Sequence, residues 1–383
     1  MNWVQSTSLY IMKSTLSPNN TFLNINLNKI LENYRIVKKY LKKGCEVGAV
    51  VKANAYGLGQ KQVVQALYQE GCHKFCVSNL DEALQIERTL EKEIYLMHGI
   101  GSIEMAEIAR EEGFIPILNH LEQIKIWNLI AKKKSEKLKA IIQIDTGMGR
   151  FGLSNTEIKK LTTDPDLVSN IEINYIMSHM SCAEQENHPA TVKQLQEFKK
   201  YLEFFPGVKA TFANSAGIFL GEDFHFDMVR PGCALYGINP TSSELNPMNS
   251  VVELYGYIVQ KRIIEKEQFI GYRAQYKATP GEKLFVIECG YADGYVRSLS
   301  NKGICYAEGY FLPVVGIVSM DAIIVNASAL PTALFDKITH IELLGEHITI
   351  DDIAKYANTI SYEILTTRFG NRCKRFYISD NNY

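Results

Sequence analysis

Lys52 is the residue of this chain best suited to covalent chemistry. It follows the apolar run Val47–Val51 and precedes the small residues of the segment Ala53–Gly59. Desolvation lowers the pKa of a lysine that emerges from an apolar strand, and the neutral amine can then form a Schiff base. The small neighbours leave room for a flat ring. We therefore expect Lys52 to hold a carbonyl compound of that shape.

Four other strand-like runs also end in polar residues. These residues are Asp145, His179, Asn214 with Ser215, and Arg230. Each has an ordinary structural explanation: His179 could be a core histidine with satisfied hydrogen bonds, and Asp145 could cap a loop. Chance placement would nevertheless rarely put polar residues at five strand ends, so we expect these residues to form one site.

Small residues follow two of these positions. The segments Ser215–Gly217 and Pro231–Cys233 both expose backbone N–H groups. Phosphate commonly binds to such groups after the last strands of a barrel. The sequence thus predicts a lysine, a phosphate site and an arginine around one opening.

The elements that must position these residues follow a βα repeat. Between about residues 46 and 237, short apolar runs alternate with helical periodicity, which is typical of a parallel sheet. The predicted strands are Val47–Val51, Phe75–Val77, Ile94–Met97, Phe114–Leu118, Ala140–Ile144, Tyr175–Ser178, Ala210–Ala213 and Met228–Val229. The predicted helices include Lys61–Glu70, Asp81–Thr89, Ile103–Glu112, Leu121–Lys133 and Val192–Phe204. Eight repeats without a glycine-rich dinucleotide loop favour a (β/α)₈ barrel of the TIM type, whose chemistry lies at the carboxyl ends of the strands.

A second, mostly β domain is predicted after the barrel. The segment Thr241–Ser250 is rich in Ser, Asn and Pro and is typical of a linker. Strand-like runs follow it at Val251–Val259, Lys283–Ile287, Gly303–Ala307, Val314–Val318, Ala322–Val325 and Ile341–Leu344. A last helix is expected to begin at Asp351 or Asp352 and to end near Tyr356.

The predicted domains are an N-terminal extension over residues 1–20, a barrel over 21–240 and a C-terminal β domain over 241–383. The first strand of the barrel region could instead join the C-terminal domain. Met12 could be a second start, because no secretory signal precedes it.

Composition excludes several function classes. The net charge of −1 and the absence of a run of 18 apolar residues indicate neither a nucleic-acid partner nor a membrane span. The eight cysteines are scattered through apolar contexts, which favours buried thiols in a reducing compartment and hence the cytoplasm. Cys72, His73 and Cys76 lack a second pair of metal ligands nearby, so no metal is expected.

Eight segments together give the chain a specific resemblance. They are VVKANAYGLG from Val50, DTGMGRFG from Asp145, SHMSCAE from Ser178, ANSAG from Ala213, VRPGCALYG from Val229, GYADGY from Gly290, SMD from Ser319 and TISYEIL from Thr359. In this order, and over residues 21–377, the chain resembles the bacterial alanine racemases of fold type III, which depend on pyridoxal 5′-phosphate.

The resemblance implies that Lys52 carries the cofactor as a Schiff base and acts as acid and base on one face of the substrate α-carbon. Arg230 would face the pyridine nitrogen and keep it unprotonated, which weakens the electron sink and limits side reactions. The cofactor-binding residues that it implies are Lys52, Tyr56, His179, Asn214, Ser215, Arg230, Gly232, Cys233 and Tyr362.

The resemblance also implies a second acid/base, Tyr272, on the opposite face. A tyrosine needs help to act as a base at neutral pH, for which His179 and Arg150 are candidates. The family shares its sites between the two subunits of a homodimer. Arg150, Tyr291 and Met320 would bind the substrate, with Tyr291 and Tyr362 narrowing the entrance so that a methyl side chain is favoured.

The implied activity is the interconversion of L-alanine and D-alanine, which supplies D-alanine for peptidoglycan in the cell wall. One position departs from the family pattern: Gln143 stands where many members have a lysine that becomes carbamylated and braces the arginine matching Arg150. Glutamine cannot carry a carbamate, so the amide itself, a bound anion or nothing would replace the brace.

Three alternatives remain open. A serine or broad-specificity racemase needs only one or two different rim residues. A fold-related decarboxylase of diamino acids would offer a cysteine followed by an acid in its second domain, whereas Glu288-Cys289-Gly290 leads directly into Tyr-Ala-Asp-Gly. A carrier of pyridoxal 5′-phosphate without catalytic activity would need neither a second domain nor Tyr272.

Overall fold

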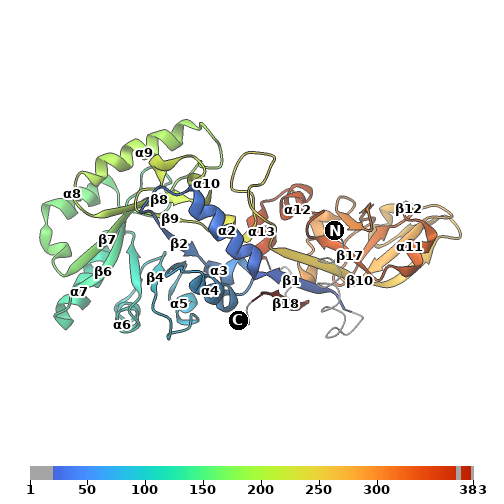
Figure 1. Ribbon diagram of the computed structural model, residues 1–383, viewed down its shortest axis with the longest axis horizontal. Helices are drawn as coiled ribbons and strands as arrows, with labels where there is room; N and C mark the ends of the chain where they lie inside the picture. The colour runs from blue at the N-terminus through green and yellow to red at the C-terminus, as the bar shows by residue number, and fades with distance from the viewer. Residues whose placement is uncertain (1–19, 368–371, 381–383) are drawn as a thin grey trace. The chain divides into compact units, whose positions relative to one another are not determined.

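The computed structural model describes residues 20–367 and 372–380. The chain divides into two compact units (Figure 1): one spans Leu27–Asn249 and takes in the chain from Ser379, and the other combines the segment ending at Asn26 with Ser250–Ile378. The expected extension, apart from Asn20, and the alternative start Met12 lie outside the described residues.

The first unit is a closed barrel of eight parallel strands in sequential order. Its strands are β2 (Glu46–Val50), β3 (Lys74–Val77), β4 (Glu93–Leu96), β5 (Ile115–Leu118), β6 (Leu138–Gln143), β7 (Ile171–Met177), β8 (Lys209–Asn214) and β9 (Met228–Arg230). The barrel closes where β2 pairs with β9. The predicted (β/α)₈ fold is therefore confirmed, with every strand within a few residues of its expected position.

Helices cover the outside of the barrel, so its strands are apolar on both faces. The helices are α2 (Leu27–Tyr40), α3 (Lys52–Tyr56), α4 (Gln60–Gln69), α5 (Leu80–Leu84), α6 (Ile103–Glu111), α7 (Leu121–Lys134), α8 (Asn155–Thr163), α9 (Pro189–Leu202) and α10 (Ser215–Ile218). The expected helix Asp81–Thr89 is too long. It ends at Leu84, because the amide of Ile86 bonds the carbonyl of Ala83 in a tight turn that buries the Ile86 side chain.

Charged pairs close the amino-terminal end of the barrel. Lys74 at the start of β3 bonds Glu93 at the start of β4 at 2.5 Å, and its amine lies 3.6 Å from Glu46 at the start of β2. The hydroxyl of Tyr175 donates to Glu46 at 2.6 Å. These contacts pair the charges at this end of the barrel, whereas the chemistry of this fold lies at the carboxyl ends of the strands.

The second unit is built on an eight-stranded sheet. Its strands are β1 (Phe22–Asn26), β10 (Val252–Ile263), β13 (Lys283–Ile287), β14 (Ile304–Ala307), β15 (Tyr310–Pro313), β16 (Ile323–Asn326), β17 (His340–Leu344) and β18 (Lys374–Ile378), and β11 (Gln268–Ile270) pairs separately with β12 (Tyr276–Ala278). The N-terminal strand β1 lies antiparallel to β10 and parallel to β18. The predicted mostly β domain is confirmed.

Two predictions in this unit are wrong in detail. No strand covers Val314–Val318: Val314 makes a single bridge to Val325, and the chain then turns at Gly316, whose φ is 76°. The helix expected to begin at Asp351 or Asp352 is α12 (Ile350–Ala357), and the capping residue is Thr349, whose hydroxyl accepts the amide of Asp352.

Shorter elements complete this unit. They are α11 (Thr332–Lys337) and α13 (Ser361–Thr366), which follows α12 and precedes β18. Across the described parts of both units, no helix combines the length and the apolar character needed to cross a membrane.

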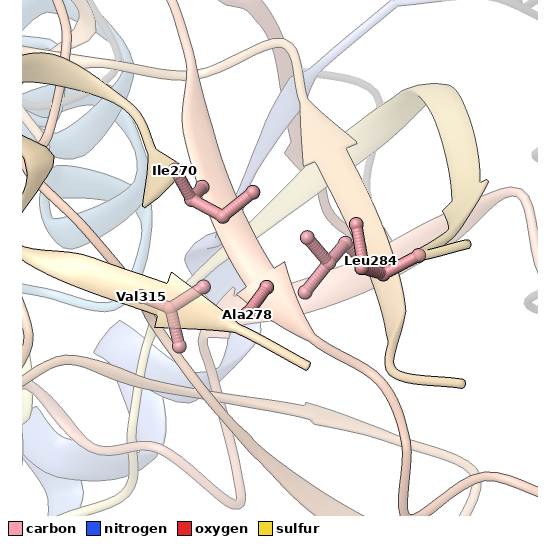
Figure 2. Packing of buried hydrophobic residues seen from close by; sticks show 5 residues of the cluster. Ile270, Ala278, Leu284 and Val315 are labelled. Carbon is pink, nitrogen blue, oxygen red and sulfur yellow. The ribbon is translucent and has the colours of Figure 1, made fainter. Parts of the chain in front are cut away.

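A small apolar cluster fastens the β11–β12 hairpin to the sheet. Figure 2 shows Ile270, Ala278, Leu284 and Val315 pointing toward one another, and Ile264 belongs to the same cluster. All five side chains are buried. Because only Gly271 separates Ile270 from Tyr272, this packing also fixes the start of the turn that carries Tyr272.

Replacing Leu284→Ala should lower the free energy of unfolding by about 2–5 kcal/mol, because the cluster loses apolar contacts and is left with a cavity. The midpoint of urea unfolding measures the change. Val259→Ala is the matched control, since its side chain is 51% exposed on β10, and its effect should stay below about 1 kcal/mol. Equal effects of the two substitutions would contradict the prediction.

Candidate active site

The expected polar residues lie at the carboxyl ends of the barrel strands. Lys52 follows β2, Asp145 follows β6, His179 follows β7, Ser215 follows Asn214 at the end of β8, and Arg230 ends β9. In a closed parallel barrel these ends form one rim. The structure thus gathers these groups of the barrel around a single opening.

Lys52 begins a turn with an unusual backbone. The next four residues, Ala53 to Tyr56, all have positive φ, at 52°, 57°, 52° and 54°. None of them is glycine, and a left-handed conformation costs an L-residue about 1–2 kcal/mol. Such strain persists only where surrounding contacts enforce it, and it gathers at functional sites.

Side chains from neighbouring elements hold this turn. Glu82 on α5 accepts the Ala53 amide at 2.8 Å. The side chain of Asn54 accepts the Gln60 amide at 2.8 Å, and the Gln60 side chain donates to the carbonyl of Val51 at 3.2 Å. The position of Lys52 is therefore fixed from both sides of the turn.

The pKa of Lys52 is lowered, first by burial and then by the positive charge of Arg150. Glu82 and the Cys76 thiol oppose this shift. A larger share of Lys52 is thus neutral at physiological pH than for an exposed lysine, and a neutral amine is the form that attacks a carbonyl.

Arg230 is held rigidly inside the barrel, with 3% of its surface exposed. Its guanidinium donates to the carbonyl of Ser178 at 2.7 Å, to that of Phe212 at 3.2 Å and to the hydroxyl of Thr211. Burial lowers its pKa to about 10, so it remains charged at neutral pH. Arg230 can therefore donate a hydrogen bond but cannot supply a proton in that range.

His179 lies beside these cations, and its Nδ1 is buried. Burial, followed by the charges of Arg230, Arg150 and Lys52, lowers its pKa to about 3. Within the described part of the chain its Nδ1 has no hydrogen-bond partner. The imidazole is therefore neutral at physiological pH and has a nitrogen left for a ligand or water.

The residues expected to hold a phosphate lie close together. The Ser215 hydroxyl accepts the amides of Gly232 and Ala234 at 2.8 and 3.3 Å. A Cβ on Gly232 would lie 2.3 Å from the hydroxyl of Tyr56, so only glycine lets these two residues approach. Cys233 follows Gly232 and is buried. Ser215, Gly232, Cys233 and Tyr56 thus form one cluster.

Asn214 has a structural role in addition. Its side chain accepts the amide of Gly217 at 3.0 Å and caps α10. Asp145 accepts the amides of Gly147, Met148 and Gly149 at about 3 Å and so shapes the loop that leads to Arg150. The suggestion that Asp145 caps a loop is therefore confirmed.

Gln143 and Arg150 lie at the two ends of this loop region. Gln143 is buried, and its amide donates to the carbonyl of Phe151 at 3.3 Å. The exposed Arg150 guanidinium lies 5.6 Å from the centre of the Phe151 ring. Gln143 therefore reaches the backbone beside Arg150, so that any brace it gives is indirect.

The other expected residues belong to the β unit. Tyr272 is 66% exposed and follows Gly271, whose φ is 70°. Tyr291 and Met320 lie together, because the amide of Tyr291 bonds the carbonyl of Ser319 at 3.0 Å. This approach needs Gly290, since a Cβ there would lie 2.3 Å from the carbonyl oxygen of Met320.

Tyr362 lies on α13 of the β unit. Asp293 behaves as the turn residue that the sequence predicts, since its side chain accepts the amide of Gly290 at 2.9 Å.

Sequence reasoning missed two kinds of residue. Thr211 and Ser178 fix Arg230 from inside the barrel, and nothing in a linear pattern points to them. Glu82 could have been found from the sequence. It is the third helical residue after the cap Asn79, and this helix begins shortly after the end of a barrel strand.

Both parts of the chain match family models. The alanine racemase N-terminal domain matches residues 25–240, and the alanine racemase C-terminal domain matches residues 251–377. The alanine racemase of Rickettsia canadensis is 39% identical and covers 93% of this chain and 98% of its own. The catabolic alanine racemase of Agrobacterium fabrum is 40% identical, with 93% and 92% covered.

Solved structures agree. The alanine racemase of Bartonella henselae with covalently bound pyridoxal phosphate matches with a TM-score of 0.88 and 41% identity, covering 94% of this chain and 99% of its own. The biosynthetic enzyme of Pseudomonas aeruginosa matches at 0.84 and 28%, with 94% and 100% covered. The chain therefore belongs to the alanine racemase family.

Proposed function

We propose that this protein interconverts L-alanine and D-alanine with pyridoxal 5′-phosphate as cofactor, and that its D-alanine serves peptidoglycan synthesis. The observation that carries the proposal is the desolvated amine of Lys52 at the rim that also holds Arg230 and the amides around Ser215. This is the set of groups that an aldehyde cofactor with a phosphate and a ring nitrogen requires.

The residues present fit that cofactor. Lys52 would bind its aldehyde, and the cluster of Tyr56, Ser215, Gly232 and Cys233 would hold its phosphate. The charged Arg230 would face the ring nitrogen. The buried Nδ1 of His179 supports this fit, because a buried polar atom that has no partner among the described residues needs a ligand or water. Asn214 and Tyr362 would complete the surroundings.

The bound cofactor supplies an electron sink that makes the α-hydrogen of an amino acid acidic enough to be removed. The chain has to supply a proton acceptor on each face. Lys52 suits one face because its lowered pKa leaves the Nζ lone pair free to accept the proton. Arg230 stays charged at neutral pH, so it donates a hydrogen bond without giving up a proton.

The second face would be served by Tyr272 of the partner subunit in a head-to-tail homodimer. The exposure of Tyr272 on its own unit supports this, since a group that serves a neighbouring chain must be accessible. Arg150 and the backbone of Met320 would bind the substrate carboxylate, and Tyr291 with Tyr362 would restrict the side chain to a methyl group.

We infer a cytoplasmic location, which the state of the thiols supports. All eight cysteines are free and five of them are buried, including Cys72, Cys76 and Cys289. Such thiols suit a reducing compartment.

The neutral state of His179 has a consequence for stability. The unfolded chain takes up a proton at this imidazole below about pH 6.5, whereas the folded chain does so only near pH 3. The folded pKa is depressed, so the stabilisation is complete above the unfolded pKa and is lost as the pH falls toward the folded one.

The free energy of unfolding should therefore fall below about pH 6.5, with His179 contributing a slope approaching 1.4 kcal/mol per pH unit. His179→Asn should remove that contribution, because an amide does not titrate. Urea unfolding of both proteins between about pH 7.5 and 5 measures it. The prediction is wrong if the slopes of the two proteins are the same.

The purified protein should be yellow and should convert L-alanine to a mixture of both enantiomers, as measured by chiral analysis after incubation with single L-amino acids. Lys52→Ala should lose the colour and reduce turnover by about 10²–10⁴-fold or more. Lys61→Ala, an exposed lysine on α4, is the control.

Two results would contradict these statements. A colourless enzyme that still racemises alanine would show that the reaction does not depend on pyridoxal 5′-phosphate. Equal conversion of L-serine and L-alanine would instead identify a broad-specificity racemase, and the restriction by Tyr291 and Tyr362 would be wrong.

Mixing Lys52→Ala and Tyr272→Ala subunits should restore activity if Lys52 works with Tyr272 of the partner subunit. Random pairing at equal amounts gives mixed dimers with one intact site, so about a quarter of the wild-type activity is expected. Differently tagged subunits show whether exchange occurred. Inactive mixed dimers would favour a site made within one chain.

A further inference from the structure

Glu82 makes two backbone contacts at the rim of the barrel with one carboxylate. Its Oε2 accepts the amide of Ser78, directly after β3, at 2.7 Å. Its Oε1 accepts the amide of Ala53, directly after Lys52, at 2.8 Å. The ends of two adjacent strands, β2 and β3, are thus joined through this side chain.

The carboxylate is itself held in place. Glu82 lies in the first turn of α5, and its amide bonds the side chain of the cap Asn79 at 3.0 Å. Together with the bond to Ser78, this fixes the direction of the side chain. Glu82 is therefore an anchored acceptor to which the Lys52 turn is attached.

The turn requires such an anchor. Ala53 has a φ of 52°, and an alanine left to itself prefers negative φ. In this conformation the Ala53 amide points at Glu82. The same turn carries Tyr56 at its far end, with its ring 4.6 Å from that of Tyr236. Any relaxation at Ala53 would move both functional side chains.

Glu82 also acts on Lys52 through its negative charge. The groups that act on the Lys52 amine from the neighbouring elements are Arg150, Glu82 and Cys76, and the amine in turn acts on His179. Arg150 repels a protonated Lys52, whereas Glu82 attracts it. The carboxylate therefore partly offsets the effect of Arg150 on the pKa of the amine.

We propose that Glu82 is a positioning residue, which locks the turn from Ala53 to Tyr56 in its left-handed conformation and so orients Lys52 and Tyr56 toward the cofactor. The role of the turn in holding a cofactor rests on the proposed function. The locking itself does not, and it can be measured without cofactor or substrate.

Hydrogen exchange of the segment 50–59 tests the locking. In E82A the Ala53 amide loses a charged acceptor, so its exchange should be faster by about tenfold or more. Asp81→Asn is the matched control, because it removes one carboxylate from an exposed position of the same helix, and its exchange in this segment should equal that of the wild type.

Unchanged exchange in E82A would overturn the proposal. If E82A does not fold, E82Q serves instead, since the amide keeps one acceptor oxygen for two backbone donors and intermediate exchange is expected. A53G in the E82A background should partly restore the protection of the Gly57 and Gly59 amides, whose acceptors lie in the same turn, because glycine adopts positive φ without strain. The amide of residue 53 itself should stay unprotected, since its acceptor is missing. If Glu82 only stabilised another part of the barrel, A53G would not restore protection in this segment.

Release of pyridoxal 5′-phosphate gives a second readout. It should be about ten times faster in E82A than in the wild type or D81N, because Lys52 and Tyr56 are no longer held together. A wild-type protein that binds no cofactor would refute the proposed function alone, since the exchange result still decides on Glu82. If E82A released pyridoxal 5′-phosphate at the same rate as the wild type, the orienting role of Glu82 would be refuted.

Discussion

Desolvation of a few charged and titratable groups at one end of a closed barrel is the constraint on which the site depends. Lys52, His179 and Arg230 are all shielded from water by the ring of strands, and burial is the largest influence on the pKa of each. Each shift favours the neutral form, but from different starting values. The result is an amine with more of its neutral form, a neutral imidazole and a guanidinium that is still charged.

Burial of cations next to one another is unfavourable, so the rest of the rim has to compensate for it. Arg230 donates to three acceptors, two on β8 and one on Ser178 directly after β7, which leaves it little freedom. Glu82 supplies a negative charge near Lys52. The same carboxylate maintains a strained backbone turn, so that electrostatic compensation and positioning are combined in a single side chain.

Close backbone approaches shape the site where side chains would not fit. Gly232 allows the hydroxyl of Tyr56 to approach the amides that Ser215 also contacts. In the β unit Gly290 does the same for the loop of Met320. In both places the absence of a side chain brings together two segments that are distant in the sequence.

Much of this was readable in the sequence, because it depends on local pattern. Alternating apolar runs and helical periodicity determined the eight strands of the barrel, and the polar residues at strand ends, together with the family segments, identified Lys52, Arg230 and Ser215. The errors fell where local pattern competes with tertiary contacts: Ile86 ended α5 early by turning into the core, and Gly316 replaced an expected strand with a turn.

The sequence by itself determined the type of each unit and the identity of the groups that can do chemistry. Only the tertiary structure decided how they are held: the pairing of β1 with β10 and β18, the left-handed turn after Lys52, and the carboxylate of Glu82 that reaches this turn from helix α5. The physical reason is that hydropathy and propensity act between near neighbours. Strain, burial and hydrogen bonds across the rim exist only once distant segments have closed into a barrel.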